Sequence, residues 1–259
     1  MQPVWNVGPL FLAAAGLLAA ADAPYMGKWK LNPAKSDFGQ TTISFAKTSS
    51  GDMQFTAEGQ SYTFKTDGKD TPALFGTTAA WKQVDANTWE TTYKINGKVL
   101  SVDTTKLSAD GKSLTVESKG TKPDGGPFDD VTVFQAVDGT SGIAGKWKTK
   151  NVKISAPGVM EFTPNGADGV TWSAIDLKAT CSARFGAATD GACSGATFGP
   201  GFAWTVRKTG SNAFEGSVKH DGKTLWISTY TVSADGKALT EASTNVVTSE
   251  KTKFVYDKQ

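Results

Sequence analysis

Apolar and polar residues alternate along most of the chain, which is the period-2 pattern of half-buried β-strands. Residues 88–95 illustrate it, since Trp89, Tyr93 and Ile95 alternate with polar neighbours. This run ends at Asn96-Gly97, the preferred pair for a two-residue hairpin turn. Further Asx-Gly pairs recur at hairpin spacing, so most consecutive strands are predicted to pair in an antiparallel meander.

The same series of short motifs occurs twice in the same order. The matching pairs are GKWK at 27–30 and 145–148, Ala-Trp at 80–81 and 203–204, Asx-Gly-Lys at 96–98 and 221–223, and SADGK at 108–112 and 233–237. Each copy has the size of a domain rather than of a solenoid unit. The sequence therefore predicts a tandem duplication.

A meander of this many strands, with no helices to cover it, must protect two exposed edges, and closure into a barrel is the usual solution. The predicted fold class is all-β, with two tandem antiparallel up-and-down β-barrels. The expected boundaries are a signal peptide at 1–23, a first barrel at 24–138 and a second barrel at 139–259. Residues 137–145, rich in turn formers, join the two copies.

The N-terminus and the cysteines indicate export. The apolar run at residues 7–23 is short for a membrane span and typical of a signal peptide, although no lysine or arginine precedes it. Cleavage after Ala21 fits the preceding alanines, and an N-terminal anchor or a buried helix is the alternative. Cys181 and Cys193, the two cysteines, are predicted to form a disulfide that pins a loop. We expect a periplasmic or secreted protein with no stable membrane span after cleavage.

Two boxes carry a resemblance to a known group. GKWKLNPAKSDFG at residues 27–39 and VYDKQ at 255–259 resemble the calycin group, in particular lipocalin-like proteins exported by bacteria. The resemblance covers both copies and implies barrels like those of lipocalins and fatty-acid-binding proteins. It also implies that Trp29 and Trp147 are structural residues that close one end of a barrel.

The same resemblance bears on Gly27 and Gly145, which begin the two Gly-x-Trp motifs and share this structural role. Fatty-acid-binding proteins hold a carboxylate with Arg-x-Tyr on the last strand. Here Phe254 stands two residues before Tyr256, so the arginine is absent. A neutral or weakly polar ligand is therefore easier to accommodate than a fatty acid.

Candidate ligand contacts are the aromatic residues in the middle of strands and the two arginines. A barrel of this size can hold one small ligand, and the same aromatics could equally form core or contacts between barrels. Arg184 and Arg207 lie in the second copy, beside its cysteine loop and glycine-rich stretch, and are candidate anion contacts. The aromatic candidates are Trp81, Trp89, Tyr93, Trp204, Phe214 and Trp226.

Motifs for catalysis, metal binding and cofactor binding are not found. His220, the single histidine, precedes a hairpin turn, where side chains are usually exposed, and no nucleophile elbow lies nearby. Zinc clusters, phosphate-binding loops and dinucleotide fingerprints are missing. The net charge is +2 with both signs interspersed, so no nucleic-acid partner is expected. We expect no cofactor and no metal, and the catalytic residues, if there are any, stay unknown.

The favoured function is an exported two-domain lipocalin-like protein that binds a small apolar or amphipathic molecule. One alternative is a barrel enzyme, such as an isomerase, cyclase or lyase, that uses buried polar side chains. Another is a structural or surface-interaction protein whose barrels are filled. The sequence favours binding over catalysis without deciding the question. The interior volume of each barrel and the charges that face it distinguish the three.

Overall fold

The computed structural model describes residues 23–195 and 200–259, and these residues form strands and tight turns. The predicted signal peptide lies outside the described residues except for Ala23. Two short 3-10 helices, η2 (Pro33–Lys35) and η3 (Leu74–Gly76), interrupt the strands of the described part. Within that part, no helix has the length and apolar character needed to cross a membrane.

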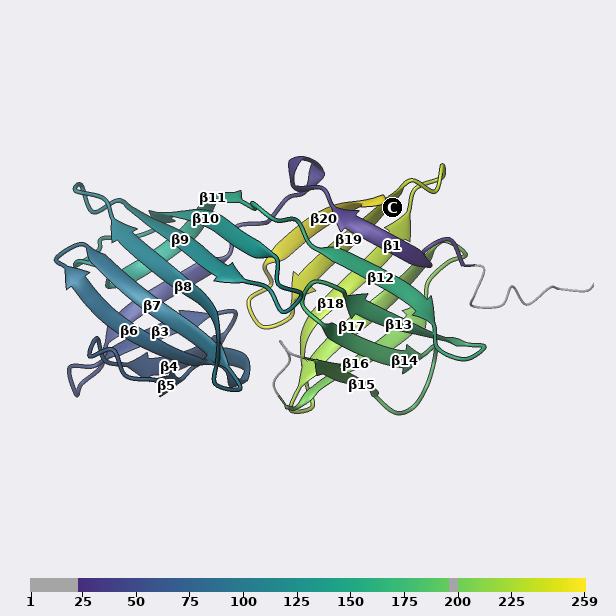
Figure 1. The fold of residues 1–259 in the computed structure, drawn as a ribbon, viewed down its shortest axis with the longest axis horizontal. Coiled ribbons are helices and arrows are strands. Elements are labelled where there is room, and N and C mark those ends of the chain that lie inside the picture. The colour runs from purple at the N-terminus through teal and green to yellow at the C-terminus, as the bar shows by residue number, and fades with distance from the viewer. Residues whose placement is uncertain (1–22, 196–199) are drawn as a thin grey trace, which may run out of the picture.

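The first sheet has ten antiparallel strands and a barrel-like shape (Figure 1). It stays open between β4 and β5, because β5 has two residues and its Pro72 has no N–H to donate. In spatial order its strands are β4 (Gln60–Phe64), β3 (Met53–Ala57), β2 (Thr42–Lys47), β11 (Gly145–Lys153), β10 (Pro127–Ala136), β9 (Ser113–Thr121), β8 (Lys98–Leu107), β7 (Thr88–Ile95), β6 (Thr78–Asp85) and β5 (Thr71–Pro72).

The second sheet also has ten antiparallel strands, and it closes into a complete barrel. Its strands, in spatial order, are β1 (Gly27–Leu31), β12 (Val159–Pro164), β13 (Gly169–Ala174), β14 (Ala179–Arg184), β15 (Gly191–Gly195), β16 (Phe202–Lys208), β17 (Ala213–His220), β18 (Lys223–Val232), β19 (Ala238–Asn245) and β20 (Lys251–Lys258). The prediction of two antiparallel meanders is thus confirmed.

The first strand of each copy, however, completes the barrel of the other copy. Trp29 on β1 pairs with Met160 of β12 and with Lys258 of β20, and Figure 1 shows β1 beside these strands. β11, which begins the second copy, pairs with β2 and β10 of the first sheet. The predicted division into 24–138 and 139–259 is therefore corrected by a strand exchange. Because β1 and β11 carry the same GKWK motif, each presents a similar edge and face to either barrel.

The exchange gives two covalent crossings between the barrels, at residues 32–41 and 154–158. The turn from β10 to β11 stays within the first barrel. Gly39 lies where the first crossing passes β20. It has a φ of +70°, and a Cβ at this position would meet the carbonyl oxygen of Lys251. The crossing therefore depends on a residue without a side chain.

Trp29 and Trp147 are fully buried in the cores of the two barrels. The Trp29 indole Nε1 donates to the Tyr25 carbonyl oxygen at 2.8 Å. The Trp147 Nε1 donates in the same way to the carbonyl oxygen of Ile143 at 2.9 Å. Gly27 and Gly145, which precede them, have positive φ values of 111° and 148°. The two halves thus share one local structure, although the strands that carry it have changed places.

The predicted match between the two Ala-Trp pairs is wrong by two residues. Trp81 of β6 lies opposite Thr91 of β7. Trp204 of β16 lies opposite Val218 of β17, which is two residues closer to the turn between β17 and β18 than the equivalent of Thr91. Gly216 takes the place of Thr91 in the second copy, and a Cβ at this glycine would stand 2.6 Å from the Trp204 Nε1. The second barrel therefore accommodates an indole at a level where the first barrel places the short side chain of Ala79.

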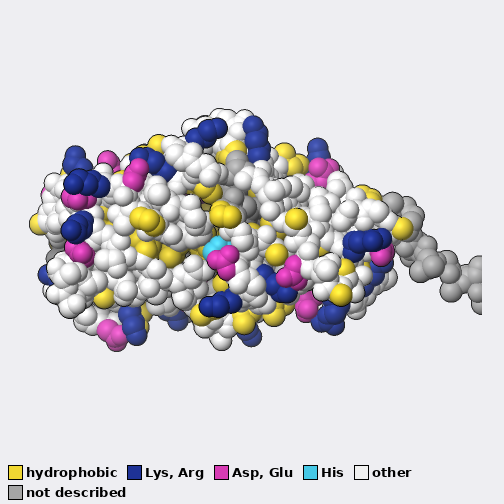
Figure 2. Space-filling model, turned by 90° about the horizontal axis from the view of Figure 1, so that it is seen from below, with side chains coloured by type: hydrophobic (Ala, Val, Ile, Leu, Met, Phe, Trp, Pro, Cys, Tyr) yellow, Lys and Arg dark blue, Asp and Glu magenta, His cyan; other side chains and the backbone are white. Residues whose placement is uncertain are grey.

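Polar and aromatic contacts hold the barrels against each other. Lys122, between β9 and β10, donates through Nζ to Asp176 Oδ2 and to the Ala156 carbonyl oxygen, each at 2.7 Å. Asp176 lies between β13 and β14, and both charged side chains are 13% exposed. On the face shown in Figure 2, acidic and basic side chains are interspersed over both barrels.

Candidate functional site

The interior of the second barrel contains a cavity of about 320 Å³. This volume falls at the lower end of the range for small-molecule sites. The larger part of its wall surface is apolar, and the remainder is polar. The lining residues are Thr41, Glu58, Trp172, Cys181, Trp204, Val218, Trp226, Ser228, Tyr230, Glu241, Ser243, Asn245, Glu250, Thr252 and Phe254.

The mouth of the cavity faces the first barrel. Thr41, which precedes β2, and Glu58, in the turn between β3 and β4, both line it. The backbone N–H of Thr42 donates to Glu250 Oε1 at 2.7 Å, which joins the β19–β20 loop to the first sheet. A Cβ on Gly59 would overlap the side chain of Val247 in the same loop. The two barrels therefore build the entrance together.

Glu241, on β19, accepts hydrogen bonds from three hydroxyl groups inside the barrel. Its Oε1 accepts from the hydroxyls of Ser228 at 3.0 Å and Tyr230 at 3.1 Å. Its Oε2 accepts from the Tyr256 hydroxyl at 2.9 Å. The period-2 geometry of β18, β19 and β20 points these four side chains to the same interior.

Burial raises the pKa of Glu241 above its ordinary value of 4.5, although the hydroxyls of Tyr256, Ser228 and Tyr230 oppose this. Burial also raises the pKa of Tyr230 and of Tyr256 well above 10, and the charge of Glu241 adds to both shifts. The tyrosines therefore stay protonated as donors at neutral pH. Glu241 gives the cavity wall a carboxyl group that takes up a proton more readily than an exposed one.

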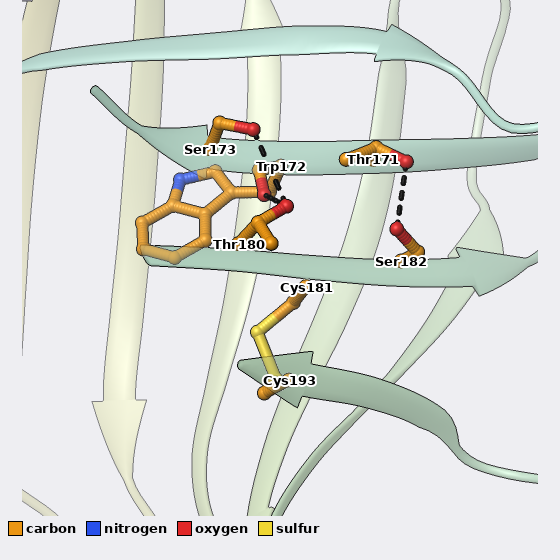
Figure 3. Close-up of a disulfide and its surroundings, with 7 residues drawn as sticks. All are labelled: Thr171, Trp172, Ser173, Thr180, Cys181, Ser182 and Cys193. Carbon is orange, nitrogen blue, oxygen red and sulfur yellow. Dashed lines mark hydrogen bonds between the residues drawn. A yellow bond between two sulfur atoms is a disulfide. The ribbon is translucent and has the colours of Figure 1, made fainter. Parts of the chain in front are cut away.

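The predicted disulfide is confirmed, and it forms part of this wall. Cys181 on β14 lies directly opposite Cys193 on β15, with their Cα atoms 4.1 Å apart. Figure 3 shows the bond beside Trp172, which pairs with Cys181 and also lines the cavity. The disulfide links the two strands of the β14–β15 hairpin and does not pin a separate loop.

On the other face of the neighbouring β13–β14 hairpin, the hydroxyls of Thr171 and Ser182 lie 2.8 Å apart (Figure 3). Those of Ser173 and Thr180 lie 3.3 Å apart. Polar residues thus alternate with the cavity-lining pair along both strands. This alternation is what separates the wall of the cavity from the outer surface.

The first barrel has a smaller cavity of about 230 Å³. Asp103 lines it, and burial raises the pKa of this carboxyl. Thr91 lies directly opposite Asp103, and both Thr91 Oγ1 and Asp103 Oδ1 are buried without a hydrogen-bond partner among the described residues. The equivalent of Asp103 in the second barrel is Ser228, which donates to Glu241 instead. The two interiors therefore differ in polar character at this pair of equivalent positions.

The structure places the predicted ligand contacts in three environments. Trp204 and Trp226 line the cavity of the second barrel. Trp81 and Tyr93 line the smaller cavity of the first. The two remaining aromatic candidates are buried in the cores and are not among the residues that line either cavity; they are Trp89 and Phe214.

The two arginines lie outside the barrel. The Arg184 Nε donates to Asp168 Oδ1 at 3.0 Å, with 66% of the arginine side chain exposed. Arg207 binds both carboxylate oxygens of Glu215 at 3.1 Å and is 68% exposed. Neither arginine lines the 320 Å³ cavity, so the predicted anion contacts are not part of it.

The sequence reasoning missed the polar network. Glu241 was detectable, because it stands two residues after Leu239 and so shares the inward face of its strand. Glu58 and Glu250 lie in turns, where the sequence gives no indication of direction. Their approach to the cavity follows from the packing of one barrel against the other.

Within the described residues, no group of three or more histidine, cysteine, aspartate or glutamate side chains is arranged to hold a metal ion. Comparison of the chain with protein-family models, with curated proteins and with solved structures found no match.

Proposed function

We propose that the protein binds one small apolar or amphipathic molecule inside the second barrel. The observation that carries this proposal is the aromatic-lined cavity of about 320 Å³, whose mouth is formed by both barrels. Aromatic walls with a few convergent polar groups are typical of small-molecule sites. The proposal includes export to an oxidising compartment, which the disulfide supports, and a relationship to the calycin group, which the repeated Gly-x-Trp strands support.

Filling each cavity separately tests the site. Ser243 lines the larger cavity, and its equivalent Ser118 lines the smaller one. A neutral hydrophobic fluorescent probe, N-phenyl-1-naphthylamine, is titrated into the intact protein and into the Ser243→Leu and Ser118→Leu variants. We expect saturable binding that Ser243→Leu abolishes and Ser118→Leu retains. Equal binding by both variants would place the probe elsewhere and contradict the proposal.

A barrel enzyme is the second candidate, and the Glu241 network favours it. A carboxyl with a raised pKa beside two tyrosine hydroxyls is suited to proton transfer, as an isomerase, cyclase or lyase requires. Glu241→Gln keeps the size of the side chain and removes its acid–base chemistry. Incubation of a bound molecule with the wild type and this variant, followed by mass spectrometry and chromatography, tests turnover. A product formed by the wild type alone would establish catalysis.

Filled barrels with a purely structural role are the third candidate. The two cavities, of about 320 and 230 Å³, argue against it because a filled barrel leaves no such space.

A further inference from the structure

The larger cavity has an unbalanced charge. Three carboxyl groups line it, those of Glu58, Glu241 and Glu250. Among the described residues that line it, none is lysine, arginine or histidine. Elsewhere on this protein acidic groups are commonly paired, as Asp176 is with Lys122 and Glu215 is with Arg207. The wall therefore carries acidic groups and no basic group to pair with them, which favours a positively charged ligand over a negatively charged one.

Glu58, at the mouth of the cavity, has fewer hydrogen-bond partners than the other two acids. Burial and the nearby charge of Glu250 both raise the pKa of Glu58. No described residue forms a salt bridge or a hydrogen bond with the Glu58 carboxylate. Glu250 is held in place, since its Oε1 accepts from the Thr42 N–H and its Oε2 from the Thr248 hydroxyl at 3.1 Å. A cation between the two carboxylates would relieve their repulsion.

The remaining wall suits the organic part of such a cation. Trp172, Trp204 and Trp226 line the cavity, and the faces of indole rings attract cations and pack against apolar groups. Asn245 adds a polar amide group to this wall. Its Oδ1 accepts from the backbone N–H groups of Val247 and Thr248, so its buried Nδ2 is directed elsewhere and has no partner among the described residues. Asn245 is 5% exposed and lines the cavity, so a ligand oxygen is a suitable acceptor for it.

We propose that the ligand is an amphipathic organic cation, whose ammonium group lies between Glu58 and Glu250 and whose apolar part lies among the tryptophans of the second barrel. This inference rests on the proposed binding function and specifies its ligand class. It also accounts for the missing arginine two residues before Tyr256, because a site for a cation needs no positive anchor. The first barrel takes part directly, since it supplies Glu58 to the mouth.

Three probes with the same chain and different head groups test the charge preference: octylammonium, octanol and octanoate. Each is titrated into the intact protein by isothermal calorimetry at neutral pH and low salt. We expect octylammonium to bind with a dissociation constant at least about tenfold below those of the other two. We also expect its affinity to fall as salt is added. If octanol or octanoate binds as tightly as octylammonium, the cationic ligand is refuted while binding in the cavity stands. If none of the three binds, both proposals are refuted.

Charge-neutral variants locate the head group. Glu58→Gln and Glu250→Gln are each expected to weaken octylammonium about tenfold and to leave octanol unchanged. Glu90→Gln is the matched control, because Glu90 is an exposed glutamate on β7 away from the cavity. Circular dichroism and thermal unfolding verify that each variant is folded. Wild-type affinity for octylammonium in both mouth variants would overturn the placement of the ammonium group.

Discussion

Replacement of Trp29 by alanine tests the exchange of first strands. Trp29 belongs to the first copy in sequence, yet its side chain is fully buried in the core of the second barrel. There its Nε1 donates to Tyr25, and Lys258 Nζ lies 5.0 Å from the centre of its ring. Truncation of a buried tryptophan to alanine costs about 3–5 kcal/mol of stability. We expect this loss in the barrel of β12–β20 and not in that of β2–β11.

Hydrogen–deuterium exchange measured by mass spectrometry separates the two barrels. In Trp29→Ala, the amides of β12 and β20 are expected to lose about a hundredfold or more of their protection, the equivalent of about 3 kcal/mol. The amides of β2 and β10 are expected to keep theirs. Trp147→Ala is the matched control and is expected to show the reverse, because Trp147 lies between β2 and β10.

The opposite result would refute the reasoning. If Trp29→Ala increased exchange in β2 and β10, each copy would close on its own first strand and the barrels would be contiguous. Equal loss in both barrels would show that they open as one unit, which contradicts the separate cores. Trp29→Phe provides a graded comparison, since it keeps most of the buried volume and loses one hydrogen bond, a change of about 1 kcal/mol beyond the difference in packing.

Three further predictions concern the polar network, the disulfide and the contact between barrels. Burial raises the pKa of Glu241, so the folded protein binds a proton that the unfolded chain releases above pH 4.5. The free energy of unfolding of the wild type, measured with urea, should therefore fall as the pH rises from this value, and Glu241→Gln should show a smaller fall. An equal fall in both proteins would contradict the burial of Glu241. Replacement of Cys181 and Cys193 by serine should cost about 3 kcal/mol in the same assay under oxidising conditions, and should cost nothing when the wild type is first reduced. Lys122→Met should cost about 3 kcal/mol of stability because it leaves the Asp176 carboxylate buried and unpaired. The double variant Lys122→Met with Asp176→Asn should recover part of that loss, and additive losses in this double-mutant cycle would argue against the ion pair.

Much of the architecture was determined by the sequence alone. Period-2 alternation and the Asx-Gly pairs are local properties, and a tight turn between two alternating runs leaves an antiparallel hairpin as the main outcome. The repeated motifs, read in the same order along both halves, predict the duplication. Cys181 and Cys193 were predicted to pair because the sequence has two cysteines and a pattern typical of export, so each has one available partner. The structure confirms the antiparallel strands and the disulfide.

The positions that depend on packing between distant segments were decided by the tertiary structure. β1 and β11 have the same GKWK motif, so their local sequence does not distinguish one barrel from the other. The crossings at 32–41 and 154–158 and the fit of one barrel against the other determine where each strand pairs. The tertiary structure also decided the strand register. The two Ala-Trp pairs have the same sequence, but their positions in the two sheets differ by two residues.

In the candidate site, too, some residues could be placed from the sequence and others only from the tertiary structure. The inward face of β19 already contained Glu241 two residues from Leu239, so alternation places this acid inside the barrel. Glu58 and Glu250 lie in turns, which have no alternating face, and they meet at the cavity only because the first barrel packs against the open end of the second. Hairpin pairing and side-chain direction are local consequences of the sequence, whereas the choice of partner for β1 and β11 and the charge at the mouth arise from contacts that form when the whole chain has folded.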